Sequence, residues 1–204
     1  FMTDTGGHYL EGSTDITRTV ALGEVGNTEK EHFTLVARAM LRLANTVFLY
    51  GCSGANLDCI AREVFWKEGL NFNHGTGHGV GYLLNIHEGP INFRWKEGER
   101  PAPALEENMV ITDEPGIYIE GSHGIRLENE LLVRKTVKNE YGQFMNFEIL
   151  TYVPIDLDAI LPEKMSTEEK EMLNHYHKQV YEKVSPYLSE EERIWLKEYT
   201  RAVK

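Results

Sequence analysis

The chain has 204 residues, of which 41% are apolar and 26% charged, and its formal net charge at pH 7 is −11. These proportions are typical of a globular domain with a sizeable core, while the acidic excess disfavours a nucleic-acid partner because phosphates carry the same sign. No apolar run has the length of a membrane span and nothing resembles a signal peptide, so we expect no membrane partner and a cytoplasmic location. The two cysteines are too few for a disulfide framework.

The first segment, up to about Leu22, is predicted to be a β-hairpin. β-branched residues alternate in TDITRTVAL, and Gly6-Gly7 ahead of it supply a turn signal. Apolar residues at helical spacing then predict an amphipathic helix over 29–49. Thr28 and Glu31 have the spacing of a capping box at its start.

A second helix is predicted from Leu57 to the end of an apolar repeat near Phe65, and Gly69 stands where a glycine commonly ends a helix. Glycines make helix improbable over 71–90. Strands are predicted again in MVITDEPGIYIE, GIRLENELLVRKTV and FMNFEILTYVPI, which are rich in β-branched and aromatic residues.

Two charged helices are predicted near 167–184 and 190–202, because Ser166 and Ser189 each precede a glutamate at capping-box spacing. The order of strands, two helices, strands and helices predicts an α+β fold. In such a fold an antiparallel sheet carries its helices on one side.

Acidic residues and histidines recur in segments that are expected to be strands or tight turns. Each alone is more typical of a solvated surface, but buried carboxylates are costly unless they are paired or bind metal, so together they favour one shared site. Glu130 is the exception, since its position is expected to face water. The set comprises Asp4 and Asp15 in the hairpin, His74 and His78 in HGTGHGVG, Asp113 and Glu114 in TDEPGIY, and Arg126, Glu128 and Glu130 in GIRLENELLV.

Charge balance suggests what such a site would bind. Asp4, Asp15, Glu114 and Glu128 supply four negative charges and His78 a neutral nitrogen, which two divalent cations would balance. Carboxylate-rich ligation with one imidazole favours Mn²⁺, with Zn²⁺ or Co²⁺ as alternatives. Two such ions about 3.5–4 Å apart can generate hydroxide and stabilise an oxyanion.

Six motifs, in one consistent order, resemble the pita-bread metallopeptidases of family M24, which include methionine aminopeptidase and prolidase. They are YLEGSTDITRT, NHGTGHGVG, LNIHEGP, ITDEPGIY, GIRLENELLV and FEILTYVPID. Within the family the chain looks most like the larger cytosolic type of Xaa-Pro aminopeptidase. The resemblance implies the later part of a catalytic domain over 1–160, truncated at its start, and a helical extension over 161–204. It leaves in question whether the chain is active without the elements that precede it in the family.

The resemblance also implies roles for the metal ligands. Asp4 and Asp15 match the two aspartate ligands, with Asp15 bridging both ions, and His78 matches the single histidine ligand. Glu114 matches a ligand that also orients or deprotonates the attacking water. Glu128 matches the second bridging carboxylate.

Three further residues match positions that act on the substrate. His74 and Arg126 match residues that line the pocket for the proline ring, and His74 is also a catalytic candidate. His87 matches the histidine that hydrogen-bonds the scissile carbonyl or moves a proton. The other histidines of the motif-free segments are expected to be ordinary surface residues: His8, His123, His175 and His177.

The resemblance implies hydrolysis of an N-terminal Xaa-Pro bond with release of the first amino acid, peptides with proline in second place as substrates, and a homodimer formed through the C-terminal tail. Two alternatives remain. One is a dipeptidase for Xaa-Pro or another hydrolase on this fold such as creatinase, although HGTGHGVG and the tail fit the aminopeptidase better. The other is a relative that binds without catalysis, and such proteins typically lose ligands.

Overall fold

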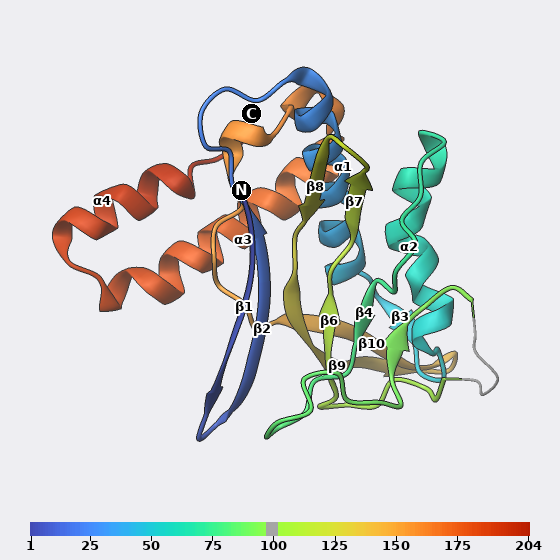
Figure 1. The fold of residues 1–204 in the computed structure, drawn as a ribbon. Helices are drawn as coiled ribbons and strands as arrows, with labels where there is room; N and C mark the ends of the chain where they lie inside the picture. The colour runs from blue at the N-terminus through green and yellow to red at the C-terminus, as the bar shows by residue number, and fades with distance from the viewer. Residues whose placement is uncertain (97–101) are drawn as a thin grey trace.

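Antiparallel strands form one side of the molecule and helices the other, in a computed structural model that describes residues 1–96 and 102–204 (Figure 1). The strands are β1 (Met2–Tyr9), β2 (Gly12–Thr19), β3 (Phe48–Leu49), β4 (Gly77–His78), β5 (Asn92–Phe93), β6 (Val110–Asp113), β7 (Gly116–Ile119), β8 (His123–Arg126), β9 (Asn129–Asn139) and β10 (Gly142–Ile149). The helices are α1 (Asn27–Ala44), α2 (Gly54–Lys67), α3 (Thr167–Val184) and α4 (Glu190–Tyr199), with short 3₁₀ helices at Leu157–Ala159, Pro162–Lys164 and Ser185–Tyr187.

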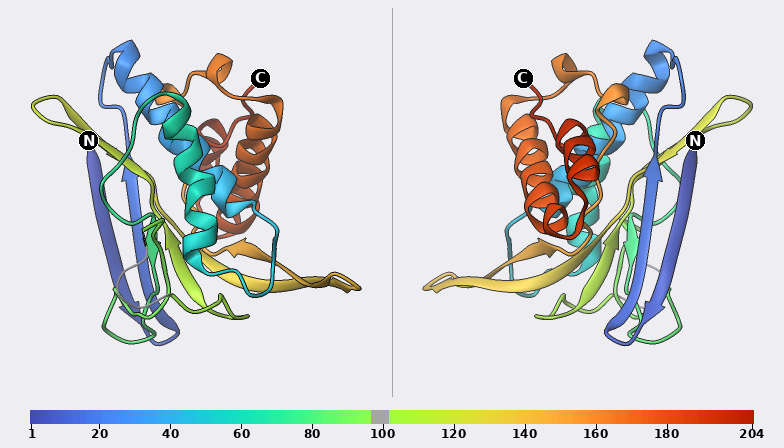
Figure 2. Two further views of the ribbon diagram at one scale, coloured as in Figure 1. Left: turned by 90° about the vertical axis from the view of Figure 1, so that its right-hand side faces the viewer. Right: turned by 90° about the vertical axis from the view of Figure 1, so that its left-hand side faces the viewer.

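The sheet is curled rather than flat. Four strands pair in the order β3-β10-β9-β6, while β1 pairs with β2 and β7 pairs with β8, all antiparallel. The side views show the β1–β2 hairpin at a steep angle to the β9–β10 ribbon, with the helices gathered behind the strands (Figure 2). A backbone bond of 3.0 Å from the Glu128 amide to the Thr17 carbonyl joins the hairpin to the rest of the sheet.

The core lies between this sheet and α1. Met40, Leu41 and Leu43 of α1 are almost fully buried, as are Ile111 and Leu131 on the facing strands. Burying one such side chain stabilises a fold by about 1.5–3 kcal/mol. This core therefore fixes the strands that carry the candidate site. Among the described helices, none combines the length and the apolar character needed to cross a lipid bilayer.

The first two helices are confirmed, but their ends differ from the prediction. The helix predicted over 29–49 begins at Asn27 and ends at Ala44, because Phe48 is in a strand that pairs with β10. The capping box at Thr28 is wrong, since Gly26 is the N-cap and makes no side-chain cap bond. Gly69 follows α2 with φ of 69°, a left-handed conformation that a glycine adopts without strain.

The hairpin is confirmed, but its turn is not at Gly6-Gly7. Both glycines lie inside β1, and the turn is at Leu10-Glu11. A Cβ on Gly6 would overlap the carbonyl oxygen of Thr14 on β2. The glycine is therefore needed for the close approach of two strands, a role that resembles a turn signal in the sequence.

Both C-terminal helices and both of their capping boxes are confirmed, although α4 ends at Tyr199. His177 of α3 is fully buried, so its prediction as a surface residue is wrong. Its side chain faces the segment after β10 instead of solvent, where its Nε2 accepts a hydrogen bond from the Ile155 amide at 3.0 Å. The division of the chain at residue 160 stays a prediction.

Candidate metal centre

Three ligand-type side chains from separate parts of the chain meet at one point. Asp15 comes from β2, His78 from β4 and Glu128 from the link between β8 and β9, and one ligand atom of each lies within 4.8 Å of the others. Within residues 1–96 and 102–204, no other group of three histidine, cysteine or acidic side chains meets this criterion. His78 Nε2 is 3.5 Å from Asp15 Oδ2.

Glu114 lies against the same histidine. It follows β6, and its Oε1 is 3.4 Å from His78 Nε2. The Thr112 hydroxyl donates a hydrogen bond of 3.1 Å to this oxygen, and the Glu114 amide donates one of 2.7 Å to the Thr76 carbonyl. Backbone and side chain are thus both fixed, so the carboxylate has a defined orientation.

Asp4 is beside the cluster but not part of it. Its half-exposed carboxylate accepts a hydrogen bond of 2.6 Å from Arg126 Nη2, while Arg126 Nε is 3.9 Å from Glu114 Oε2. Burial raises the pKa of Asp15, and the nearby Asp4 carboxylate raises it further. Arg126 therefore links two predicted ligands.

The two remaining predicted histidines flank the site. The ring of His87 is 4.3 Å from that of His78, and both line a cavity of about 420 Å³. The half-buried ring of His74 is 5.4 Å from Tyr118, whose hydroxyl accepts a 2.7 Å bond from Arg126. All the residues that the sequence suggested for ligands and substrate contacts therefore form one connected region.

The carboxylates of this region are held in an environment that disfavours negative charge. Burial, reinforced by neighbouring acids, raises the pKa of Glu128 to about 8. Burial likewise raises the pKa of Glu114 to about 7, and that of Asp15 rises for the same reason. Cations would relieve this cost, and a set of carboxylates with one imidazole suits hard or borderline divalent ions. The donor set therefore fits the predicted metal pair.

The position of His78 is set by its backbone. A Cβ on the preceding residue, Gly77, would overlap the carbonyl oxygen of Thr112, so this crossing of two strands admits only glycine. The His78 amide donates a 3.0 Å hydrogen bond to the Thr112 hydroxyl. Gly77 of HGTGHGVG thus lets β4 lie directly against β6.

A buried ion pair on α2 supports the same loop and was not foreseen from the sequence. Arg62 Nε donates to Asp58 Oδ2 at 2.5 Å, and its other nitrogens donate to the carbonyls of Phe72 at 2.7 Å and His74 at 2.6 Å. The Thr76 hydroxyl also donates to Asp58. The sequence does contain a signal for this ion pair, because Asp58 lies four positions before Arg62 on the apolar face of the predicted helix.

Thr17 is a second residue that the sequence reading missed. Its hydroxyl donates a 2.7 Å hydrogen bond to Glu128 Oε2 and accepts one of 3.0 Å from Arg126 Nε. Side chains two apart on a strand share a face, so Thr17 accompanies Asp15. That alternation would have been sufficient to predict it.

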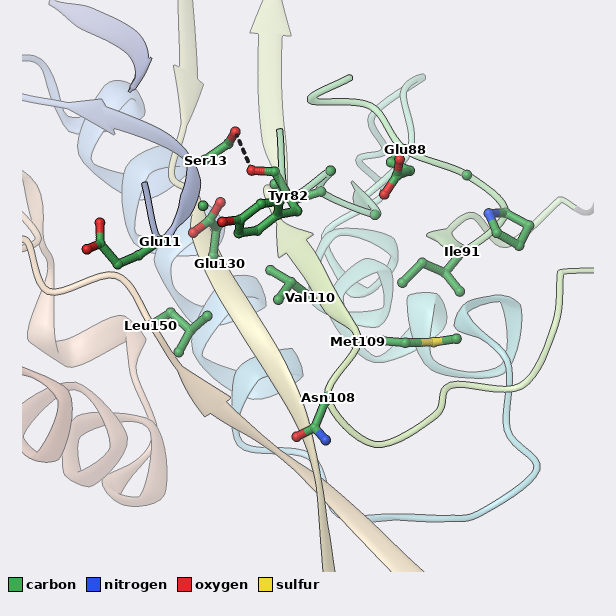
Figure 3. A pocket seen from close by; sticks show the side chains of 16 residues that line it. Glu11, Ser13, Tyr82, Glu88, Ile91, Asn108, Met109, Val110, Glu130 and Leu150 are labelled. Carbon is green, nitrogen blue, oxygen red and sulfur yellow. Dashed lines mark hydrogen bonds between the residues drawn. The ribbon is translucent and has the colours of Figure 1, made fainter. Parts of the chain in front are cut away.

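Glu130 corrects one expectation. It is only 6% exposed rather than facing water, and its Oε1 accepts a 3.1 Å hydrogen bond from the Asp15 amide. This bond joins the start of β9 to β2. Figure 3 shows Glu130 with Glu11 and Leu150 among the side chains around an adjoining cavity of about 470 Å³.

Asp113 is fully buried, and among the described residues neither carboxylate oxygen has a hydrogen-bond partner. It alternates with Thr112 along β6 and therefore points to the opposite face from the Thr112–Glu114 contact. Burial raises its pKa well above the usual range. Asp113 therefore stands apart from the ligands with which the sequence grouped it.

Comparison with known proteins gives the family. A profile described as Metallopeptidase family M24 matches residues 1–135, and one for the C-terminal region of this peptidase family matches residues 143–203. The chain is 40% identical over its whole length to a probable Xaa-Pro aminopeptidase P of Paracoccidioides brasiliensis and 41% identical to that of Talaromyces marneffei. It covers 34% and 32% of those two proteins, so it spans about a third of the length of these relatives.

Solved structures agree with this. The X-prolyl aminopeptidase of Caenorhabditis elegans, described as a cytosolic enzyme with a di-nuclear active site, superposes with a TM-score of 0.92 at 37% identity, covering 99% of this chain and 33% of that one. The Xaa-Pro dipeptidase of Bacillus anthracis gives a TM-score of 0.60 at 34% identity, covering 76% of this chain and 40% of that one. The chain therefore belongs to metallopeptidase family M24 and has that family's pita-bread fold.

Proposed function

We propose that this chain supplies the metal centre of a dinuclear Xaa-Pro aminopeptidase, which hydrolyses an N-terminal Xaa-Pro bond and releases the first amino acid. The observation that carries the proposal is the convergence of Asp15, His78 and Glu128, with Glu114 against the histidine. It occurs in a chain that is similar over its full length to Xaa-Pro aminopeptidases.

Two divalent cations, with Mn²⁺ as the first choice and Zn²⁺ or Co²⁺ as alternatives, would be held by Asp4, Asp15, His78, Glu114 and Glu128. When bound, they would lower the pKa of water and neutralise negative charge on the substrate carbonyl. The Asp4 side chain is half exposed, which leaves it free to turn from Arg126 toward a cation. Oxygen-rich ligation of this kind is the reason for placing Mn²⁺ first.

Glu114 acts as the general base. It lies against His78 beside the proposed cations, and its hydrogen bond from Thr112 fixes the carboxylate that accepts the proton. It takes the proton of the attacking water and passes it to the proline nitrogen as the peptide bond breaks. The same group thus serves as base and then as acid.

The flanking residues bind the substrate. His87 donates a hydrogen bond to the carbonyl oxygen as negative charge develops there. His74 and Arg126 line the pocket for the proline ring. The free amino group of the substrate faces the carboxylates of Asp4 and Asp15, which places the scissile bond one residue from the N-terminus.

Aminopeptidase is preferred to dipeptidase because the relatives that match this chain over its whole length are Xaa-Pro aminopeptidases, although an X-Pro aminopeptidase of Thermotoga maritima covers only 75% of it. The C. elegans aminopeptidase structure covers 99% of this chain, whereas the prolidase of Pyrococcus horikoshii covers 76%, with a TM-score of 0.62. We propose peptides with proline in second place as substrates and, by similarity to the cytosolic C. elegans enzyme, a cytoplasmic location. The homodimer stays a prediction.

The test is a substrate series with the longest natural protein that carries this chain. After chelation and readdition of Mn²⁺, it is assayed on Xaa-Pro, on Xaa-Pro-Yaa and on longer peptides. An aminopeptidase cleaves the tripeptide and the longer peptides, and a dipeptidase cleaves only Xaa-Pro. A protein that binds no metal and cleaves none of them is a binding module.

A further inference from the structure

We propose that Arg18 is a positioning residue that ties the C-terminal helix α3 to strand β2, which carries Asp15, and to the β8–β9 link, which carries Glu128. The spacing of these ligands would then depend on the C-terminal region of the chain. This inference rests on the metal centre proposed above and adds to it a residue that does not itself touch the metal or the substrate.

Arg18 lies behind the site rather than in it. On β2, Asp15 and Thr17 point toward the ligands, so alternation turns Arg18 to the opposite face of the strand. The residue is only 6% exposed. Its guanidinium is therefore enclosed between β2 and the elements that pack behind it.

One side of the guanidinium holds the two ligand-bearing segments together. Nη1 donates to the Thr17 carbonyl at 2.9 Å and to the Glu128 carbonyl at 2.5 Å. Nη2 donates to Asn129 Oδ1 at 2.7 Å. Glu128 is therefore held twice, because its carboxylate accepts from the Thr17 hydroxyl at 2.7 Å while its carbonyl accepts from Arg18.

The other side reaches the C-terminal region. Nη2 lies 2.9 Å from the Val153 carbonyl and 2.8 Å from the hydroxyl of Tyr176 on α3, and it shares its two hydrogens between these acceptors and Asn129, while Nε donates to the Pro154 carbonyl at 3.2 Å. Tyr176 is almost fully buried, and its hydroxyl lies 2.7 Å from the Val153 carbonyl, to which it donates. A displacement of α3 therefore reaches Glu128 through one side chain.

All of these acceptors are uncharged. Across the described part of the chain, no carboxylate lies within ion-pair distance of Arg18, so a buried cation is held by carbonyl, amide and hydroxyl oxygens alone. Burying a charge without a counter-ion is costly. The planar guanidinium of arginine can donate to several segments at once in a fixed geometry. The single ammonium group of a lysine cannot do this. The arrangement is suited to positioning.

The test compares Tyr176→Phe with Tyr181→Phe in the longest natural protein that carries this chain. Tyr181 is a matched control because it lies on the same helix, packs against the core and makes no side-chain hydrogen bond to the described residues. Titration calorimetry measures the Mn²⁺ affinity, and thermal unfolding in chelator measures the stability of the metal-free protein. Removing a partner bonded directly to a ligand residue typically lowers metal affinity by about 10–100-fold, and Arg18 is such a partner of Glu128. Tyr176 acts one contact further away, so we expect about 3–10-fold for Tyr176→Phe and less than 2-fold for Tyr181→Phe.

Arg18→Lys, which keeps the charge but loses the fork, is expected to weaken Mn²⁺ binding at least as much as Tyr176→Phe. If Tyr176→Phe and Arg18→Lys lower the melting temperature of the metal-free protein but leave the Mn²⁺ affinity within 2-fold of wild type, the residues are only structural and the inference is wrong. Failure of the proposed function looks different, because the wild-type protein itself would then bind no Mn²⁺.

Discussion

The buried imidazole of His177 predicts that acid detaches α3 from the segment it packs against. Its Nε2 accepts the Ile155 amide, which requires the neutral ring, and burial lowers its pKa from 6.5 to about 4. Replacement by glutamine keeps an acceptor oxygen but removes the titration. Comparing wild type with His177→Gln therefore isolates the contribution of this one group.

The sign follows from proton uptake. Between pH 6.5 and about pH 4 the unfolded chain binds a proton at His177 and the folded chain does not. The free energy of unfolding therefore decreases as the pH is lowered through this interval. The full shift corresponds to roughly 3 kcal/mol, of which roughly 2.5 kcal/mol is already lost at pH 4.5. Glu114 and Glu128, whose pKa values are raised, act in the opposite direction in both proteins and cancel in the comparison.

The assay is urea unfolding of both proteins in chelator at pH 7.5 and at pH 4.5. Wild type should lose roughly 2.5 kcal/mol more than the variant between the two conditions. Equal losses in the two proteins would show that His177 is not kept neutral by the fold. The reasoning about α3 would then be refuted, whatever the stability of the variant at pH 7.5.

Further predictions concern the site itself. Glu128→Gln should lower metal occupancy and turnover together, and near-normal activity would contradict a bridging role. His87→Ala should leave metal content intact while turnover falls by roughly 10²–10³, as when one oxyanion donor is lost; a parallel loss of metal would make it a ligand instead. Glu130→Ala leaves the Asp15 amide without its acceptor and should cost about 1–3 kcal/mol in urea unfolding, with Glu130→Gln closer to wild type. Mn²⁺ at about 100 times its Kd should raise the free energy of unfolding by about 2.7 kcal/mol, reversibly with chelator, and no shift would exclude specific binding to the folded state.

Periodicity in the sequence was sufficient to predict the helices and most strands, because the spacing of apolar residues follows the buried face of each element. Helix ends were less well predicted, because α1 stops where Phe48 joins a distant strand. The five predicted metal ligands could be assigned their roles only from the motifs that resemble family M24. Asp15, His78 and Glu128 meet in the structure with Glu114 beside them, whereas Asp4 is paired with Arg126. Thr17 could have been added from strand alternation alone.

The roles of Glu130, Arg18 and His177 could not be predicted in this way. Polar residues are usually exposed, and the reason these are buried lies in partners that pack from far along the chain. Tyr176 is 158 residues from Arg18, and Asp15 is 115 residues from Glu130. A single sequence carries no signal for such pairs.

The contact between Gly77 and the Thr112 carbonyl has a consequence for how this enzyme family member can be altered. Where two main chains touch, the backbone position of the neighbouring His78 is set by the strand contact. Mutational libraries over 82–86, which leave His87 unchanged, could therefore explore new peptide preferences without losing the His78 imidazole, whereas even alanine at position 77 should displace it.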